Sequence, residues 1–352
     1  MSLRNSLFFL LVVCSCFKIG AQSAGFIAPP PGEGPLEVTV TLHVNKIYNV
    51  NSVNETYQVD GYLVFAWQDD RLKFNPQDSL THKLVYENQR ARDIANSTFW
   101  VPAFELINIQ GMQQTQNIQL IVYPDGRVMF NERFFGVFHT EMDFKRFPFD
   151  SKTFEIQIEA FSYNSKHLVF KDLKLLPGEE NMDNKLGEDW ELIQTSSEVA
   201  TESYGNLIDR SADADEDNFS RAIFKVQAER MSGYYLWQVL FPLFIIILAS
   251  FTIYWIKEFA SQIGIAFTLM LTVVAFNFYS ASILPKLPYN TFIEYVIIVG
   301  YIFILFGIFA VIFNHWVEDH KTKKYNLFNY FKVLVPICYV AIMAILYFSH
   351  LS

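Results

Sequence analysis

Cysteine is scarce in this chain of 352 residues, and its scarcity argues against a fold stabilised by disulfides. Only three cysteines occur: Cys14 and Cys16 lie close to the N-terminus, and Cys338 lies inside an apolar segment. Any domain that folds outside the cell between them must therefore be held together by burial of its core alone.

The sequence also has fewer basic than acidic residues and contains no recognisable catalytic motif. The 27 Lys and Arg against 36 Asp and Glu leave a net charge of −9, which argues against a nucleic-acid partner because phosphate binding needs clustered basic side chains. We find no His/Cys metal spacing, no nucleophile elbow and no convincing carboxylate pair. We therefore expect no enzyme, no catalytic residue, no cofactor and no metal, whereas an acidic surface would concentrate cations nearby.

The first residues resemble a secretory signal peptide. Arg4 precedes a short apolar run, Leu7 to Val13, and small residues follow around Ala21 to Ala24. Because the run is too short to span a bilayer, we expect residues 1–23 to be cleaved; an uncleaved anchor helix is the alternative.

The N-terminal half alternates apolar and polar residues, which is typical of strands. EVTVTLHV (37–44) places its Val and Leu side chains on one face, and TYQVDGYLVFAW, FEIQIEAF and FSRAIFKVQA have the same period. Pro124-Asp125-Gly126 supplies a hairpin turn between two such runs. We expect an all-β, immunoglobulin-like sandwich over residues 24–233.

One of these strands carries a candidate site. In FEIQIEAF (154–161), Glu159 and Phe161 are neighbours on the face opposite the core. The simplest interpretation is a solvated glutamate beside a surface aromatic ring, and a ligand site is the alternative.

Four apolar segments follow, each long enough for a helix to cross a hydrocarbon core. We expect an all-α, four-helix transmembrane domain over residues 234–352, with helices at about 235–256, 261–283, 290–314 and 329–348. Four spans place the N-terminal domain and the C-terminus on one side, extracellular or periplasmic, and the lysine-rich third linker indicates the cytoplasmic side. The chain is thus expected to be a multi-pass cell-membrane protein in contact with lipid.

The second span is too polar to face lipid on every side. Steps of three and four residues trace one stripe along it: Gly264, Thr268, Leu271, Ala275, Phe278 and Ser282. A ring of such helices would enclose a water-filled path with apolar constrictions at Leu271 and Phe278. A helix that uses its hydroxyls inside a bundle core is the alternative.

Four motifs, in this order and spacing, resemble the pentameric ligand-gated ion channels, or Cys-loop receptors. They are FPFD (147–150), PLF in the first span, AFTLMLTVVAF in the second, and LPKLPY (284–289) after it. The resemblance covers nearly the whole mature chain and is strongest to the prokaryotic branch, which includes an amine-gated channel. Members with the family disulfide carry cysteines at the positions of Thr140 and Phe154, where this chain has none.

The resemblance implies a homopentamer, in which four identical subunits join each chain and the second helix lines a pore. A small-molecule agonist would bind between neighbouring sandwiches, and an acid within an aromatic box suits a cationic amine. The implied ligand residues are Glu159, Phe161, Tyr204 and Phe219 on the principal face, with Tyr62 and His43 on the complementary face. RSADADED (210–217) is either a solvated loop or a weak divalent-cation site.

The resemblance also implies how binding is relayed to the pore. The implied coupling residues are Glu55, Phe147, Pro148, Phe149, Asp150, Arg230, Pro285 and Lys286. Asp150, Glu55 and Arg230 form a buried ionic cluster or remain separate surface charges. The bond before Pro148 is expected to be cis.

The resemblance indicates the ion selectivity of the pore less directly. Cation-conducting relatives place a glutamate where this chain has Ala260 and Ser261, and Glu258 is the nearest substitute. Because a carboxylate ring favours cations, we expect monovalent cations to permeate. The alternative from a different class is a membrane-anchored ligand sensor or adhesion module that does not conduct ions.

Overall fold

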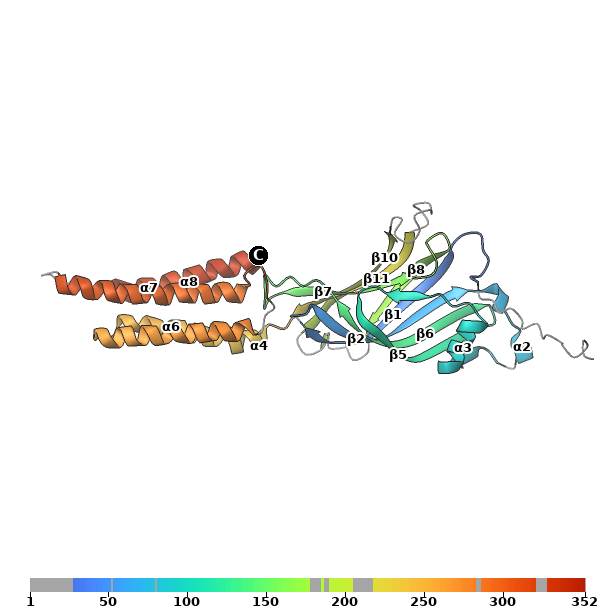
Figure 1. Cartoon of the computed structure of the whole chain (residues 1–352), viewed down its shortest axis with the longest axis horizontal. Coiled ribbons are helices and arrows are strands. Elements are labelled where there is room, and N and C mark those ends of the chain that lie inside the picture. Colours follow the sequence, from blue (N-terminus) through green and yellow to red (C-terminus); the bar gives the residue numbers. More distant parts are fainter. Residues whose placement is uncertain are drawn as a thin grey trace, which may run out of the picture.

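The computed structural model describes residues 28–51, 53–79, 81–177, 185–186, 190–204, 218–282, 286–320 and 328–351. A β-sandwich and a bundle of helices lie end to end along one long axis (Figure 1). The C-terminal end of the last helix lies where the two parts meet (Figure 1). The C-terminus and the sandwich therefore lie on the same side of the helices, as predicted from the number of spans.

The described residues of the sandwich form two sheets. The six-stranded sheet has the order β3-β5-β6-β2-β1-β8 and the five-stranded sheet β4-β7-β11-β10-β9. The strands are β1 (Leu36–Asn51), β2 (Thr56–Gln68), β3 (Leu84–Glu87), β4 (Phe104–Leu106), β5 (Ile109–Val122), β6 (Arg127–His139), β7 (Ser151–Ala160), β8 (Leu168–Pro177), β9 (Lys185–Leu186), β10 (Trp190–Ser203) and β11 (Asn218–Arg230). The 3-10 helix η1 (Asp70–Leu72) and helices α2 (Pro76–Ser79) and α3 (Asn88–Ser97) join them. The prediction of a β-sandwich is confirmed.

The period-two pattern builds this core directly. Val38, Val40 and Leu42 of β1 have no exposed surface. Phe154 and Phe224 of the other sheet have none either and belong to the same core. The predicted hairpin joins β5 to β6: the Gly126 N–H donates to the Tyr123 carbonyl at 2.9 Å, with Gly126 at φ 86°. That φ is open to glycine at little cost, which explains its place in the turn.

Among the described residues, the C-terminal part contains four helices long and apolar enough to cross a membrane. The first joins α4 (Gly233–Tyr235), a π turn (Leu236–Leu240), α5 (Phe241–Phe251) and the 3-10 turn η4 (Thr252–Tyr254). The others are α6 (Phe259–Ala281), α7 (Phe292–His320) and α8 (Phe328–Leu351). The π turn directly precedes Pro242, whose missing N–H interrupts the regular ladder. Helix α7 is longer than expected, because no Gly or Pro breaks the polar turn that ends at His320.

Candidate functional site

An outward-facing carboxylate on β7 is buried by its neighbours. Strand pairing places Arg221 of β11 directly beside Glu159, and the Arg221 Nη2 lies 2.7 Å from Glu159 Oε2. The Tyr204 hydroxyl donates to Glu159 Oε1 at 2.7 Å. Glu159 is only 6% exposed, so the simple interpretation of a solvated glutamate is wrong. Its charge is neutralised within the same sheet.

Aromatic rings surround this ion pair. The rings of Tyr204 and Phe219 lie edge to face with their centroids 5.8 Å apart, a favourable geometry for an aromatic pair. Burial raises the pKa of Tyr204, and its hydrogen bond to Glu159 acts in the same direction. Phe161 follows the end of β7 and is 66% exposed. The structure thus brings Glu159, Tyr204 and Phe219 together and leaves Phe161 open to a partner.

Sequence reasoning missed Arg221. The signal was present, because in FSRAIFKVQA the residue lies two positions after Phe219 and so shares its outward face. Its second nitrogen contact, from Nη2 to the Tyr204 hydroxyl at 2.9 Å, makes it the centre of the cluster. The cluster therefore contains its own cation.

The expected complementary residues lie on the other sheet. His43 of β1 and Tyr62 of β2 are paired across the ladder, and their rings stack with centroids 6.2 Å apart. The Arg133 guanidinium lies 5.8 Å from the Tyr62 ring and forms an ion pair with Asp60 at 2.9 Å. Within one chain these residues form a group separate from the Glu159 cluster, as expected for the two halves of an intersubunit site.

A buried ionic cluster lies at the junction between sandwich and helices. The Arg230 Nε donates to Asp150 Oδ1 at 2.7 Å, and Nη2 donates to Oδ2 at 3.2 Å. The third member is Lys152, whose Nζ lies 3.1 Å from Asp150 Oδ2, and not the expected Glu55. Lys152 shares the face of Asp150 because it lies two residues along the strand, whereas the Glu55 carboxylate accepts from the Met142 N–H at 3.3 Å.

This cluster carries two cations on one carboxylate. Asp150, Lys152 and Arg230 are each 5% exposed or less. Burial lowers the pKa of Lys152, and the charge of Asp150 opposes that effect. The alternation of β7 already indicated that Lys152 points inward, because it shares the parity of the buried Phe154 and Ile156.

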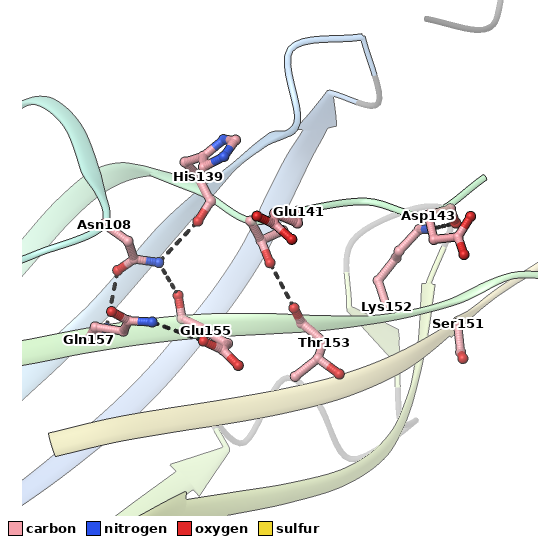
Figure 2. A pocket seen from close by; sticks show the side chains of 10 residues that line it. Asn108, His139, Glu141, Asp143, Ser151, Lys152, Thr153, Glu155 and Gln157 are labelled. Atoms are coloured by element: carbon pink, nitrogen blue, oxygen red, sulfur yellow. Dashed lines mark hydrogen bonds between the residues drawn. The ribbon is translucent and has the colours of Figure 1, made fainter. Parts of the chain in front are cut away.

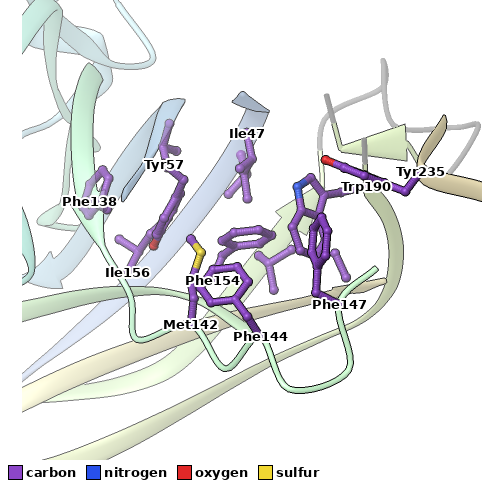
Figure 3. Close-up of a cluster of buried hydrophobic side chains, with 14 of the residues drawn as sticks. Ile47, Tyr57, Phe138, Met142, Phe144, Phe147, Phe154, Ile156, Trp190 and Tyr235 are labelled. Atoms are coloured by element: carbon purple, nitrogen blue, oxygen red, sulfur yellow. The ribbon is translucent and has the colours of Figure 1, made fainter. Parts of the chain in front are cut away.

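Aromatic rings of the FPFD loop contact the helices, and Figure 3 shows one of them, Phe147, near Tyr235. Phe147 is buried, and its ring lies 4.7 Å from that of Tyr235 at the start of the first span. The ring of Phe149 lies 5.8 Å from that of Phe292 in α7 and 6.4 Å from that of Tyr347 in α8. The Phe147–Pro148 bond is cis, as the resemblance implied. The loop therefore touches three of the four spans.

The linker after α6 also meets this loop. The Tyr289 hydroxyl accepts a hydrogen bond from the Phe144 N–H at 3.1 Å. Lys286 is exposed, and Pro285 and residues 210–217 lie outside the described residues. At the base of the loop, the Thr140 hydroxyl donates to the Thr153 carbonyl at 2.9 Å. A hydrogen bond thus closes the loop near the positions where relatives have a disulfide.

A cavity of about 510 Å³ is lined by residues on both sides of the FPFD loop, among them Glu141 and Lys152, and by Asn108 and Gln157 (Figure 2). The Asn108 side chain organises its floor by donating to the carbonyls of His139 and Glu155 and accepting from the Gln157 N–H. Glu141, Asp143 and Glu155 line the same cavity together with Lys152. Among the described residues, no group of three or more His, Cys, Asp or Glu could hold a metal ion.

Helix α6 leaves its predicted stripe uncovered. All six residues of the stripe are exposed in the single chain: Gly264, Thr268, Leu271, Ala275, Phe278 and Ser282. Leu271 and Phe278 are 70% and 73% exposed, whereas Ala266 and Val273 are buried against the other helices. The opposite packing of the two faces is expected of a helix that turns one side toward a shared axis.

Glu258 lies immediately before α6. Its carboxylate accepts a hydrogen bond from the Ser261 hydroxyl at 2.7 Å, within the first turn of the helix. A carboxylate is favoured at this end by the helix dipole. Glu258 therefore lies at the mouth of any pore that the exposed stripe lines.

Comparison with known proteins gives one consistent result. Residues 26–226 match the family of neurotransmitter-gated ion-channel ligand binding domains. A proton-gated ion channel of Gloeobacter violaceus is 24% identical over 332 residues, covering 92% of this chain and 87% of that protein. Gamma-aminobutyric acid receptor subunit beta-4 of Gallus gallus is 23% identical over 298 residues, and subunit rho-2 of Homo sapiens is 24% identical over 314. The chain spans 57% and 63% of these two receptor subunits.

Proposed function

The chain belongs to the family of pentameric neurotransmitter-gated ion channels, and from this premise we propose that a cationic amine opens it to monovalent cations. The protein is a ligand-gated ion channel and not an enzyme, with an extracellular N-terminal domain and several membrane spans. Family membership implies five subunits around a central pore. The alternative of a non-conducting sensor or adhesion module is not supported by any of these relatives.

The observation that carries the amine proposal is the acid within aromatic rings on the outer face of the five-stranded sheet. Glu159 contacts Tyr204, whose ring packs on Phe219, and Phe161, two residues after Glu159, is exposed. A carboxylate and ring faces both attract an ammonium group. The stacked His43 and Tyr62 of the neighbouring subunit would close the site from the other side.

Strand β11 offers a direct path from this site to the membrane. Phe219 lies near its start, and Arg230 at its end pairs with Asp150 of the FPFD loop. At about 3.4 Å per residue, the two positions are roughly 37 Å apart. Phe147 and Phe149 then meet the helices. We propose that agonist binding shifts this strand and loop relative to the helices, since a ligand acts through contacts that differ between states.

The pore is proposed to follow the stripe of α6. Leu271 and Phe278 would form its two dry constrictions, and Gly264, Thr268, Ala275 and Ser282 would line the wider levels. A ring of five Glu258 carboxylates at the cytoplasmic mouth would favour cations. The acidic excess of the chain would add to this preference by concentrating cations near the vestibule.

We further propose that the protein is a prokaryotic-type member similar to the amine-gated bacterial channel. The supporting features are the absence of cysteine at Thr140 and Phe154 and the hydrogen bond from Thr140 that closes the loop. The proposed domain boundaries are 1–23 for a signal peptide, 24–233 for the ligand-binding sandwich and 234–352 for the transmembrane domain.

Protons are a second candidate stimulus. Glu132 of β6 points into the core between the buried residues Phe130 and Phe134 and is 5% exposed. Burial raises its pKa to about 7, which the hydrogen bond from Gln113 and the charge of Arg92 only partly oppose. The Gloeobacter violaceus relative is itself named a proton-gated ion channel. Because this carboxyl titrates near neutral pH inside the sandwich, a change in its protonation would change the packing of the sandwich core.

Phe161→Ala tests the amine proposal. Purified pentamers in a planar bilayer are titrated with primary alkylamines of two to six carbons, and the half-maximal concentration is read from the current. Because a cation–π contact is worth about 0.5–2 kcal/mol, the variant should need roughly 2- to 30-fold more amine. Ile193→Ala removes a similarly exposed apolar side chain from the same sheet and should leave the titration unchanged. An unchanged titration for Phe161→Ala removes this residue from the site.

A further inference from the structure

The carboxylate proposed to bind the amine is already occupied. Glu159 Oε2 accepts from the Arg221 Nε at 2.8 Å and lies 2.7 Å from Nη2. Glu159 Oε1 accepts from the Tyr204 hydroxyl at 2.7 Å. Both oxygens therefore have partners, and the side chains of Glu159 and Arg221 are 7% and 12% exposed. An ammonium group that binds here would therefore compete with Arg221 and Tyr204 for Glu159.

Arg221 has a second acid within reach. Its Nη1 lies 3.5 Å from Glu202 Oε1, and the Glu202 side chain is 42% exposed. Strand pairing explains the geometry: Arg221 stands opposite Glu159 of β7, while Glu202 of β10 stands opposite Phe219, two residues before Arg221. The guanidinium thus lies between two carboxylates on the strands to either side.

The two carboxylates offer unequal contacts. Nε and Nη2 reach Glu159 at hydrogen-bond distance, whereas only Nη1 approaches Glu202, at a longer distance. An arginine presents five N–H donors in a rigid, planar group. A small rotation of the guanidinium can therefore exchange one carboxylate partner for the other without leaving the arginine unpaired. Moving a buried arginine away from Glu159 with no other acid nearby would be far more costly.

We propose that Arg221 is an internal counter-ion that an amine agonist displaces from Glu159, with Glu202 receiving the displaced guanidinium. This inference rests on the proposed amine function and assigns the regulation of that same site. In the ligand-free chain Arg221 occupies the place of the ammonium group. Because the amine must compete with Arg221 for Glu159, Arg221 sets the amine concentration needed to open the channel. After the exchange the ammonium pairs with Glu159, and Arg221 pairs with Glu202.

The exchange gives the ligand a contact that differs between states. Glu202 lies at the end of β10, two residues before Tyr204, while Arg221 lies on β11 and leads along that strand to Arg230. Drawing Arg221 toward Glu202 tightens the pairing of β10 with β11 at the end that bears the ligand. Such a differential contact is what a ligand needs in order to shift a conformational equilibrium.

The test uses two variants in which a charged side chain is replaced by uncharged glutamine. Each is titrated with the same alkylamines as Phe161→Ala, and amine binding and maximal open probability are measured separately. Arg221→Gln removes the internal competitor and should lower the half-maximal amine concentration at least tenfold, equivalent to about 1.4 kcal/mol. Glu202→Gln removes the receiving acid and should raise that concentration severalfold. Lys225→Gln is the matched control, since Lys225 lies on the same face of β11 and pairs with the exposed Glu198 at 2.7 Å; its titration should be unchanged.

Folding is controlled by pentamer size in gel filtration. The double variant Arg221→Gln with Glu159→Gln keeps the site neutral and should assemble but lose amine potency, even where the single variant folds poorly. An unchanged or raised amine requirement in Arg221→Gln, together with a weakened response in Phe161→Ala, overturns the displacement and leaves the amine function standing. If no amine gates the wild type or any variant, both proposals fall.

Discussion

Replacing Glu132 by glutamine should make the protein more stable at neutral pH and leave it unchanged in acid. The carboxyl lies in the core stripe of β6, where burial raises its pKa to about 7 from an ordinary value of 4.5. Below pH 4.5 the folded and unfolded chains both carry the proton, so the residue costs nothing. As the pH rises from 4.5 to 7 the unfolded chain releases the proton first, and the folded state loses stability over that window.

The size of the effect follows from the same pKa. Because one pKa unit corresponds to about 1.4 kcal/mol, wild-type stability should fall by about 3 kcal/mol between pH 4.5 and pH 7.5 through this group. Glutamine keeps the shape and can still hydrogen-bond to Gln113 but carries no charge, so it escapes this loss.

The assay is thermal unfolding of the full pentamer in detergent, followed by tryptophan fluorescence from pH 4 to pH 8. At about 2–4 °C per kcal/mol, Glu132→Gln should unfold roughly 6 to 12 °C higher at pH 7.5, with the gap closing near pH 4.5. Glu141→Gln, at an exposed site, should show no pH-dependent gap. A gap that stays constant with pH, or a less stable variant at pH 7.5, refutes the reasoning.

Two further predictions concern the junction and the mouth of the pore. Asp150→Asn leaves Arg230 and Lys152 buried without their shared carboxylate, which should cost about 3–5 kcal/mol and abolish current while amine binding persists; retained current in an intact pentamer counts against the coupling role. Glu258→Gln should move the reversal potential under a sodium chloride gradient toward that of chloride. An unmoved potential removes Glu258 from the selectivity assignment.

Much of the fold was predictable because it depends on local periodicity. The period-two runs placed the buried faces of the strands correctly, since alternation alone decides which side chains point inward. The stripe of α6 was predictable for the same reason at a period of 3.6 residues. Even the hairpin at Gly126 follows from its local turn signal.

The ionic partners at the two sites were harder to predict, because strand register decides them. Arg221 meets Glu159 only because β11 pairs with β7 at that position, and the two residues are far apart in the sequence. Lys152 joins Asp150 because the end of β7 turns both inward beside Arg230. The alternation of β7 places Lys152 on the core face, but no single-strand pattern shows that Asp150 and Arg230 meet there. Glu55 was expected because the family resemblance implied it.

Current through the pore tests the central claim most directly. Purified protein in a planar bilayer should pass current that depends on amine or pH. Leu271→Ala should raise the open probability, because it removes a dry apolar ring. Val340→Ala, on the exposed face of α8, should behave like the wild type. Silence across the amine and pH panel from intact pentamers, or equal open probability in Leu271→Ala and wild type, would contradict a gated pore lined by α6.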